Sequence, residues 1–114
     1  MLPNHSPLVV AEQYSTLAAY YPDRVDLGLG RASGTDMATA QALGRHLKTG
    51  DDFPRDVAEV SHFLGGSSTD NVRAKAASGT KVPVWILGTS LFGAELAAGW
   101  ACPLCSRRIS PLAC

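Results

Sequence analysis

The stretch Val82-Pro83-Val84-Trp85-Ile86-Leu87-Gly88-Thr89-Ser90 contains the clearest fold signal in the chain. Its first six residues are nearly all apolar, which is typical of a strand of a parallel sheet that is buried on both faces. The glycine and the two hydroxyl residues that follow predict a turn into a helix over residues 91–98. We expect Leu91, Ala94 and residues 96–98 to be the inward side of that helix. The stretch therefore predicts one strand-and-helix unit.

A similar unit lies nearer the amino terminus. Val25, Leu27 and Leu29 alternate with more polar or smaller residues, and a glycine-rich turn follows, which predicts a strand that ends in a loop. Ser6-Pro7 predicts the start of a preceding helix, with the serine side chain accepting hydrogen bonds from its first free amides. That helix should end at Pro22 and carry an apolar face formed by Leu8, Ala11, Tyr14, Leu17, Ala18 and Tyr21.

Two helices are expected between these strands. Asp36 predicts the start of a helix over residues 37–46, with Ala40, Ala42 and Leu43 inward. Asp52 with Pro54 predicts a second helix, which Gly65 and Gly66 stop, and its shared face would consist of Val57, Val60, Phe63 and Leu64. Residues 65–81 lack any period and predict a long exposed loop. Helices that alternate with strands indicate right-handed crossovers and a parallel sheet, so the class is α/β.

The composition excludes several classes of partner. Ten Lys and Arg balance ten Asp and Glu in 114 residues, which gives no electrostatic footprint for nucleic acid or an anionic membrane. The longest apolar run is far shorter than the roughly 20 residues of a membrane-spanning helix. Met1 is followed by no segment of signal-peptide type. We therefore expect a cytoplasmic protein with no nucleic-acid or membrane partner.

The residues after the two strands suggest a phosphate site. Arg31 follows the first strand, and a guanidinium there can hold a phosphate through two hydrogen bonds. Thr89 and Ser90 follow the second strand, where free amides and hydroxyls suit an anion. Three alternatives stay open: the glycines of residues 28–34 form a dinucleotide motif, they form a merely structural turn, or Thr89 and Ser90 are a plain helix cap.

Other conspicuous residues receive plainer interpretations. His5 is read as a loop histidine, although a catalytic role is conceivable at a strand end. The aromatic side chains, Phe92 among them, are assigned to the core. Cys102 and Cys105 have the spacing of half a zinc site or a redox pair, but with only Cys114 besides them the set is incomplete, so no metal site is predicted.

The chain up to about residue 98 resembles the luciferase-like flavin-dependent monooxygenases, a bacterial luciferase-like family. The matching segments lie in the family's order and comprise residues 2–8, 10–13, 24–32, 34–36, 51–54 and 84–88 together with Ser90. Three positions depart from the usual pattern: Asp23 replaces a Gly, Ser33 replaces a Pro, and Thr89 replaces a Ser. This agreement is much more specific than any single glycine motif.

The resemblance implies a partial (β/α)8 TIM barrel of about three β/α units, formed by residues 1–98. It also implies reduced FMN as the cofactor, bound at the carboxyl ends of the strands. Arg31 would clamp the flavin phosphate, Ser90 with the Thr89 amide would complete that clamp, and Leu29 and Gly30 would approach the isoalloxazine ring. No catalytic residue is assigned, because the strand that supplies the family's catalytic histidine is expected to lie outside the chain.

The same resemblance implies oxidation of a small organic substrate, aldehyde-like or unknown, by O2. A flavin reductase would supply the reduced flavin, and members of the family are often dimers. With about three of eight units, the chain alone should be inactive, should not bind flavin stoichiometrically and should aggregate through its open sheet edges. The alternatives are a small α/β dinucleotide-binding module and a translated fragment without function.

Residues 99–114 are expected to be a tail read in a shifted frame. Trp100-Ala101-Cys102-Pro103 must be encoded TGG-GCN-TGY-CCN, which one base earlier reads NTG-GGC-NTG-YCC and can spell Leu-Gly-Leu-Pro. Residues 109–112 shifted in the same way can spell His-Phe-Ala-Pro. The resembled family carries both tetrapeptides at these places. On this hypothesis the cysteines result from the frame, and the reading frame ends at Cys114 on an out-of-frame stop codon.

Overall fold

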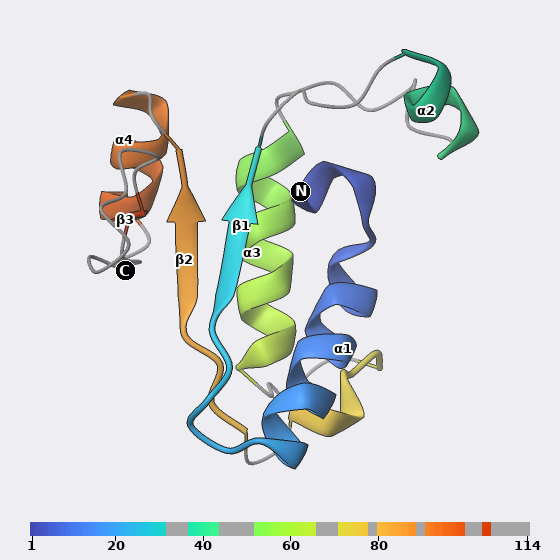
Figure 1. Ribbon diagram of the computed structural model, residues 1–114, viewed down its shortest axis with the longest axis vertical. Helices are drawn as coiled ribbons and strands as arrows, with labels where there is room; N and C mark the ends of the chain where they lie inside the picture. Colours follow the sequence, from blue (N-terminus) through green and yellow to red (C-terminus); the bar gives the residue numbers. More distant parts are fainter. Residues whose placement is uncertain are drawn as a thin grey trace.

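A parallel sheet with helices between its strands forms the centre of the computed structural model (Figure 1). The structure describes residues 1–31, 37–43, 52–65, 71–77, 80–88, 91–99 and 104–105. The elements along the chain are η1 (Leu2–Asn4), α1 (Pro7–Tyr20), β1 (Leu27–Gly30), α2 (Met37–Ala42), α3 (Phe53–Leu64), η3 (Lys75–Ala77), β2 (Val84–Leu87), α4 (Leu91–Gly99) and β3 (Leu104–Cys105). The predicted order of elements up to residue 99 is confirmed, with η1 and η3 as additions.

The three strands lie in the order β1-β2-β3, so strands that neighbour in the sequence neighbour in the sheet. In the parallel register Leu27 lies opposite Val84 and Leu29 opposite Ile86. Successive residues of a strand point to opposite faces, so these four residues belong to one face of the sheet. Gly28 and Gly30 belong to the other face together with Trp85 and Leu87, their partners in β2.

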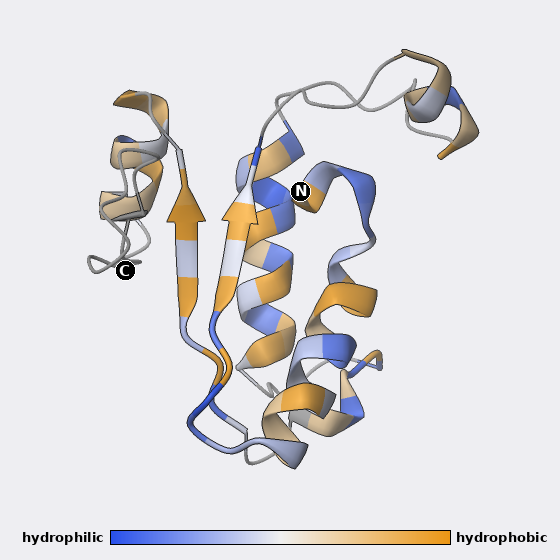
Figure 2. Cartoon of the chain, in the orientation of Figure 1, coloured by the Kyte–Doolittle hydropathy of each residue, from blue (hydrophilic) through white to orange (hydrophobic). Residues whose placement is uncertain are grey.

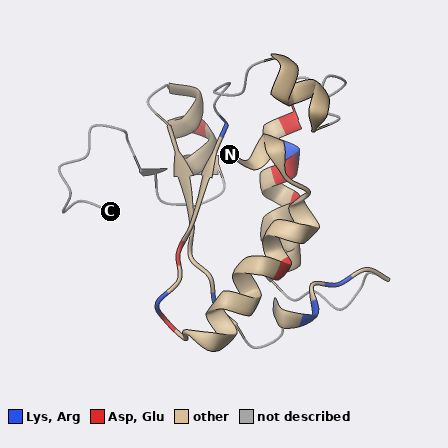
Figure 3. Cartoon of the chain, turned by 45° about the vertical axis from the view of Figure 1, so that its right-hand side comes forward, with Lys and Arg blue, Asp and Glu red and all other residues tan. Residues whose placement is uncertain are grey.

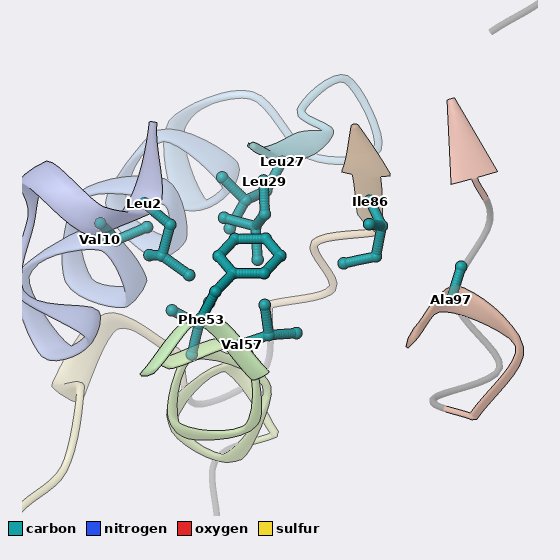
Figure 4. Packing of buried hydrophobic residues seen from close by; sticks show 9 residues of the cluster. Leu2, Val10, Leu27, Leu29, Phe53, Val57, Ile86 and Ala97 are labelled. Atoms are coloured by element: carbon teal, nitrogen blue, oxygen red, sulfur yellow. The ribbon is translucent and has the colours of Figure 1, made fainter. Parts of the chain in front are cut away.

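Among the described residues, the main core cluster lies on one face of the sheet. Leu27, Leu29 and Ile86 point toward Phe53 and Val57 of α3, as Figure 4 shows from close by. The same cluster contains Leu2 of η1, Val10 of α1, Val60 of α3 and Ala97 of α4. Since α1, α3 and α4 all contribute to it, the helices gather on this helix-covered face. In Figure 2 both β1 and β2 carry orange, hydrophobic residues, and orange bands recur along α3.

The opposite face of the sheet is open, which corrects one expectation. Residues 82–87 were predicted to be buried on both faces, yet Leu87 is 42% exposed while its neighbour Ile86 is fully buried. No helix of the described chain covers the side on which Leu87 lies, because α1, α3 and α4 all pack against the other side. The strand is also shorter than expected, since β2 begins at Val84, after Pro83.

The first helix begins and ends near the predicted residues, but its buried side differs in part. Ser6 is the N-cap, yet its side chain makes no capping hydrogen bond, and its carbonyl accepts from the Val10 amide at 3.0 Å. Leu17 and Tyr21 were expected inward and are exposed. Val10, Ala11, Ser15 and Ala18 are buried instead. The inward side is set by where α3 and η3 lie against the helix.

The second predicted helix is the clearest error in burial. α2 covers Met37–Ala42 and buries none of its residues; Ala42 and Leu43 are exposed, and only Ala40 is half-buried. Figure 1 shows α2 standing apart from α1, α3 and the sheet, so no apolar surface is available to cover it. The third helix agrees better, since Asp52 is its N-cap, Gly65 its C-cap and Val57 and Val60 are fully buried.

The predicted loop of residues 65–81 contains a packed element. η3 follows Ala74, which is buried and packs with Ala11 of α1 in a small second cluster. Leu8 and Phe63 pack against the same cluster. The small residues of this segment show no hydrophobic periodicity, so the sequence did not predict the contact. Alanine can pack wherever two backbone segments approach closely, and no local pattern marks such a place.

One turn shows backbone strain. Asp23, between α1 and β1, has a φ of 58°, in the left-handed region that favours glycine. It is the position at which the resembled family carries Gly, and aspartate is among the residues that tolerate this region best. No helix in the described part of the chain combines the length and apolar content needed to cross a membrane.

Candidate functional site

The carboxyl ends of β1 and β2 meet at one edge of the sheet. Gly30, the last residue of β1, lies opposite Leu87, the last residue of β2. Arg31 and Gly88 are therefore neighbours in space at the edge where both strands end. Ligand sites of parallel α/β proteins form at this edge. The predicted meeting of the two strand ends is thus confirmed for the described residues.

Arg31 reaches from the end of β1 to the helix that follows β2. Its Cζ atom lies 4.4 Å from the centroid of the Phe92 ring, in the first turn of α4. The guanidinium is attracted by the negative face of the ring. The arginine side chain itself is exposed, so its N–H groups remain open to a ligand. A cationic group therefore lies at the start of α4.

The turn before α4 brings its backbone close to the helix. A Cβ atom added to Gly88 would lie 3.8 Å from the Cα of Gly93, an ordinary van der Waals contact, so the turn packs directly against the helix. α4 begins at Leu91, and the first amides of a helix have no partner within the helix. Thr89 and Ser90, which were predicted to complete the phosphate clamp, lie outside the described residues. Their roles stay predictions.

The two residues predicted to approach the flavin ring lie on different faces of the sheet. The Leu29 side chain is 2% exposed and belongs to the core on the helix-covered face, so only its backbone is available to a ligand. Gly30 belongs to the open face, and a Cβ atom added there would meet no heavy atom nearer than Leu87 Cβ at 4.0 Å. Gly30 therefore leaves space beside the strand end.

Gly28 is crowded where Gly30 is not. A Cβ atom added to Gly28 would lie 3.0 Å from Leu87 Cδ1 and 3.3 Å from Leu87 Cδ2. The missing side chain lets Leu87 lie across β1 on the open face. Trp85 is on the same face, and its buried indole Nε1 has no hydrogen-bond partner in the described structure. The open face is thus lined by Leu87 and Trp85 over a glycine strand.

The two described arginines on the elements nearest this edge have different surroundings. Arg55, near the start of α3, lies 3.4 Å from Asp52 and 3.8 Å from both Asp56 and Glu59, and Figure 3 shows this mixture of red and blue on α3. No carboxylate among the described residues pairs with Arg31. The charge of Arg55 is therefore partly neutralised, whereas no described carboxylate neutralises the charge of Arg31.

Sequence reasoning missed Phe92, which was assigned to the core. Its side chain is 37% exposed and lies under Arg31. Its place in the first turn of the helix after the predicted anion-binding turn was the available signal. His5 is exposed, just after η1. Cys102 and Cys114 lie outside the described residues, as does the side chain of Cys105, and no group of metal-binding side chains occurs in the described part.

The dinucleotide interpretation finds less support in this geometry than the phosphate clamp does. A dinucleotide site needs a helix that begins directly at the glycines, whereas α2 begins at Met37 and stands apart from the sheet. A doubly wound sheet also carries helices on both faces, whereas the described helices that join the core, α1, α3 and α4, lie on one face. Helices on one face of a parallel sheet in sequential strand order suit a barrel wall.

Comparison with known proteins agrees with this geometry. The model of a family described as luciferase-like monooxygenase matches residues 1–112. A luciferase-like monooxygenase of Escherichia coli K12 is 54% identical over 105 residues, which is 90% of this chain and 31% of that protein. The N-acetyl-S-alkylcysteine monooxygenase of Bacillus subtilis is 32% identical over 104 residues, covering 86% of this chain and 31% of its own length.

A solved structure shows the same fold. The crystal structure of apo-MsnO8 superimposes with a TM-score of 0.83 at 35% sequence identity, over 93% of this chain and 32% of that one. The chain thus spans about a third of the length of the relatives that it matches.

Proposed function

Since the chain belongs to the luciferase-like monooxygenase family, which implies a TIM-barrel fold, we propose that it is part of a flavin-dependent monooxygenase barrel. In this proposal residues 1–98 supply about three β/α units of the barrel wall. The helix-covered face of the sheet is the outside of the barrel, and the open face is its lumen. The reaction is the oxidation of a small organic substrate by O2, with reduced FMN as cofactor and a flavin reductase as its source. Members of the family are often dimers, and the proposal includes a dimer of the complete barrel on that ground alone.

The position of Arg31 carries the proposal. It is an exposed guanidinium without a carboxylate partner in the described structure, at the carboxyl end of a parallel strand and beside the start of α4. A phosphate of FMN placed there would accept two hydrogen bonds from the guanidinium and lie near the free amides of the helix. The Ser90 hydroxyl and the Thr89 amide would add donors to the same group.

The open face fits the rest of the cofactor. Gly30 leaves its side of β1 bare, which would allow the flat flavin ring to approach the backbone of Leu29 and Gly30. When bound, reduced flavin supplies the electrons that activate O2, and the protein provides orientation and exclusion of water. The residues of this chain bind and orient. We assign none of them to proton transfer.

The proposal is tested in a barrel that contains the missing units. Residues 1–98 replace the matching segment of the E. coli relative, and this chimera is called the host barrel. Arg31→Ala in the host barrel should weaken reduced FMN by about 1.5–3 kcal/mol, the scale of a charge-assisted hydrogen bond. Anaerobic titration should therefore show a loss of about 10- to 150-fold.

Two controls isolate the phosphate. Riboflavin lacks it, so Arg31→Ala should leave riboflavin affinity nearly unchanged. Arg24→Ala removes the same charge from an exposed arginine at the opposite end of β1 and should affect neither ligand. An equal loss for FMN and riboflavin would refute the phosphate role of Arg31.

For residues 99–114 we propose a shifted reading frame. Within this segment the structure describes the strand β3, which pairs with Ile86 and Leu87 of β2. Sequencing the gene from codon 99 through codon 114 tests the idea. The frame one base earlier should be open and should encode Leu-Gly-Leu-Pro and later His-Phe-Ala-Pro. If that frame is closed or does not encode both tetrapeptides, the idea fails and Cys102 and Cys105 again become candidates for a function of their own.

A further inference from the structure

We infer that Phe92 is a positioning residue for the anion site: its ring holds the Arg31 guanidinium at the first turn of α4. The inference rests on the proposed function, in which Arg31 binds the flavin phosphate. It adds the residue that holds Arg31 in position. Arg31 and Phe92 lie on different β/α units, and the contact of 4.4 Å between Cζ and the ring centroid joins them.

An aromatic ring is suited to this task because it orients the guanidinium without occupying its donors. A carboxylate partner would accept the same N–H groups that a phosphate needs and would cancel the charge. Arg55 is in that situation, with Asp52, Asp56 and Glu59 all within 4 Å. The Arg31 Cζ atom lies over the Phe92 ring, which carries no charge to cancel that of the guanidinium, so Arg31 keeps N–H donors for a phosphate.

Holding the side chain in place favours binding. An arginine has several rotatable bonds and loses rotamer freedom when it binds a ligand. A ring that already restricts the side chain reduces this loss, so the same hydrogen bonds give a higher affinity. Phe92 is more than one-third exposed, so packing in the core is only part of its role.

The neighbouring residue provides a matched control. Leu91 belongs to the same first turn of α4 and is 81% exposed, and no ring contact ties it to Arg31. Leu91→Ala and Phe92→Leu each make an exposed apolar side chain of α4 smaller. Only the loss of Phe92 should change the site.

The experiment measures reduced FMN and riboflavin binding to variants of the host barrel. Phe92→Leu should weaken FMN by about 3- to 10-fold, the range expected for loss of a partly exposed cation–π contact, and should leave riboflavin unchanged. Phe92→Tyr should bind FMN within about twofold of the parent, because tyrosine keeps the ring face. Leu91→Ala should match the parent. In an Arg31→Ala background, Phe92→Leu should cause no additional loss.

A variant that keeps the size of the ring at position 92 tests whether a loss of affinity comes from misfolding. Pentafluorophenylalanine at position 92 retains a ring of similar size but not its negative face, so it should weaken FMN as Phe92→Leu does. Parental FMN affinity in both of these variants, with a loss in Arg31→Ala, would overturn the positioning role and leave the proposed function standing. Equal weakening of FMN and riboflavin would also overturn it. An Arg31→Ala variant with parental FMN affinity would refute the proposed function and, with it, this inference.

Discussion

The two faces of the sheet differ in every respect that bears on stability and binding. The helix-covered face places Leu27, Leu29 and Ile86 against α3 and leaves each at most 2% exposed. The open face has two glycines on β1 and, on β2, Trp85 and the exposed Leu87. A parallel sheet is normally covered on both sides. The difference indicates that one face holds the fold together. In the proposed function the other face lines the lumen of the complete barrel, where the flavin would bind.

The largest effect is expected on the helix-covered face. Phe53 is 2% exposed and lies in the middle of the main cluster. Phe53→Ala in the host barrel should lower the free energy of unfolding by about 3–5 kcal/mol, since it removes buried surface and leaves a cavity. Urea denaturation measures the loss. Tyr20→Ala, at a residue that is 77% exposed, is the control and should change stability by less than about 0.5 kcal/mol. Similar losses in both variants would contradict the one-sided core.

A smaller effect is expected on the open face, in the 114-residue chain itself. The exposed apolar residues of that face should make the chain self-associate. Leu87→Lys adds a charge there and should raise the concentration at which association begins by about tenfold, since burying one leucine contributes roughly 1.5–3 kcal/mol. Light scattering after gel filtration provides the measurement.

The control for this experiment is Val9→Lys. Val9 is also exposed, at 46%, but lies on α1, away from the sheet. It should not reduce association. A parent chain that is monomeric and melts cooperatively would show that the open face needs no cover.

The smallest expected effect is a difference in stability between alanine substitutions at the two glycines of β1. Gly30→Ala has room for its Cβ and should stabilise the host barrel by about 0.4–1 kcal/mol, because alanine restricts the unfolded chain. Gly28→Ala should gain less than Gly30→Ala or lose stability, since Leu87 Cδ1 lies 3.0 Å from the new atom and must move. Thermal melting of both variants decides the order. If Gly30→Ala is the more damaging, another part of the barrel fills the space beside Gly30.

Local patterns in the sequence determined most of the elements. The alternation at Leu27 and Leu29 predicted β1. The spacing of Val57 and Val60 predicted the buried side of α3, and Asp52 and Gly65 predicted where that helix begins and ends. Arg31 was singled out because a charged residue directly follows a strand. These features depend on residues close together in the chain, so the sequence alone predicts them. The barrel and the flavin were predicted only through the resemblance to a known family.

Tertiary structure decided what depends on distant segments. The apolar run of β2 has no alternation, so only the position of α3 made Ile86 inward and Leu87 outward. Nothing near Ala42 or Leu43 indicated that α2 would stand away from the sheet and leave both exposed. The contact of Arg31 with Phe92 exists because parallel pairing of β1 and β2 brings the residues after both strands to one edge. A side chain's neighbours across a sheet are set by register and packing, which no local pattern specifies.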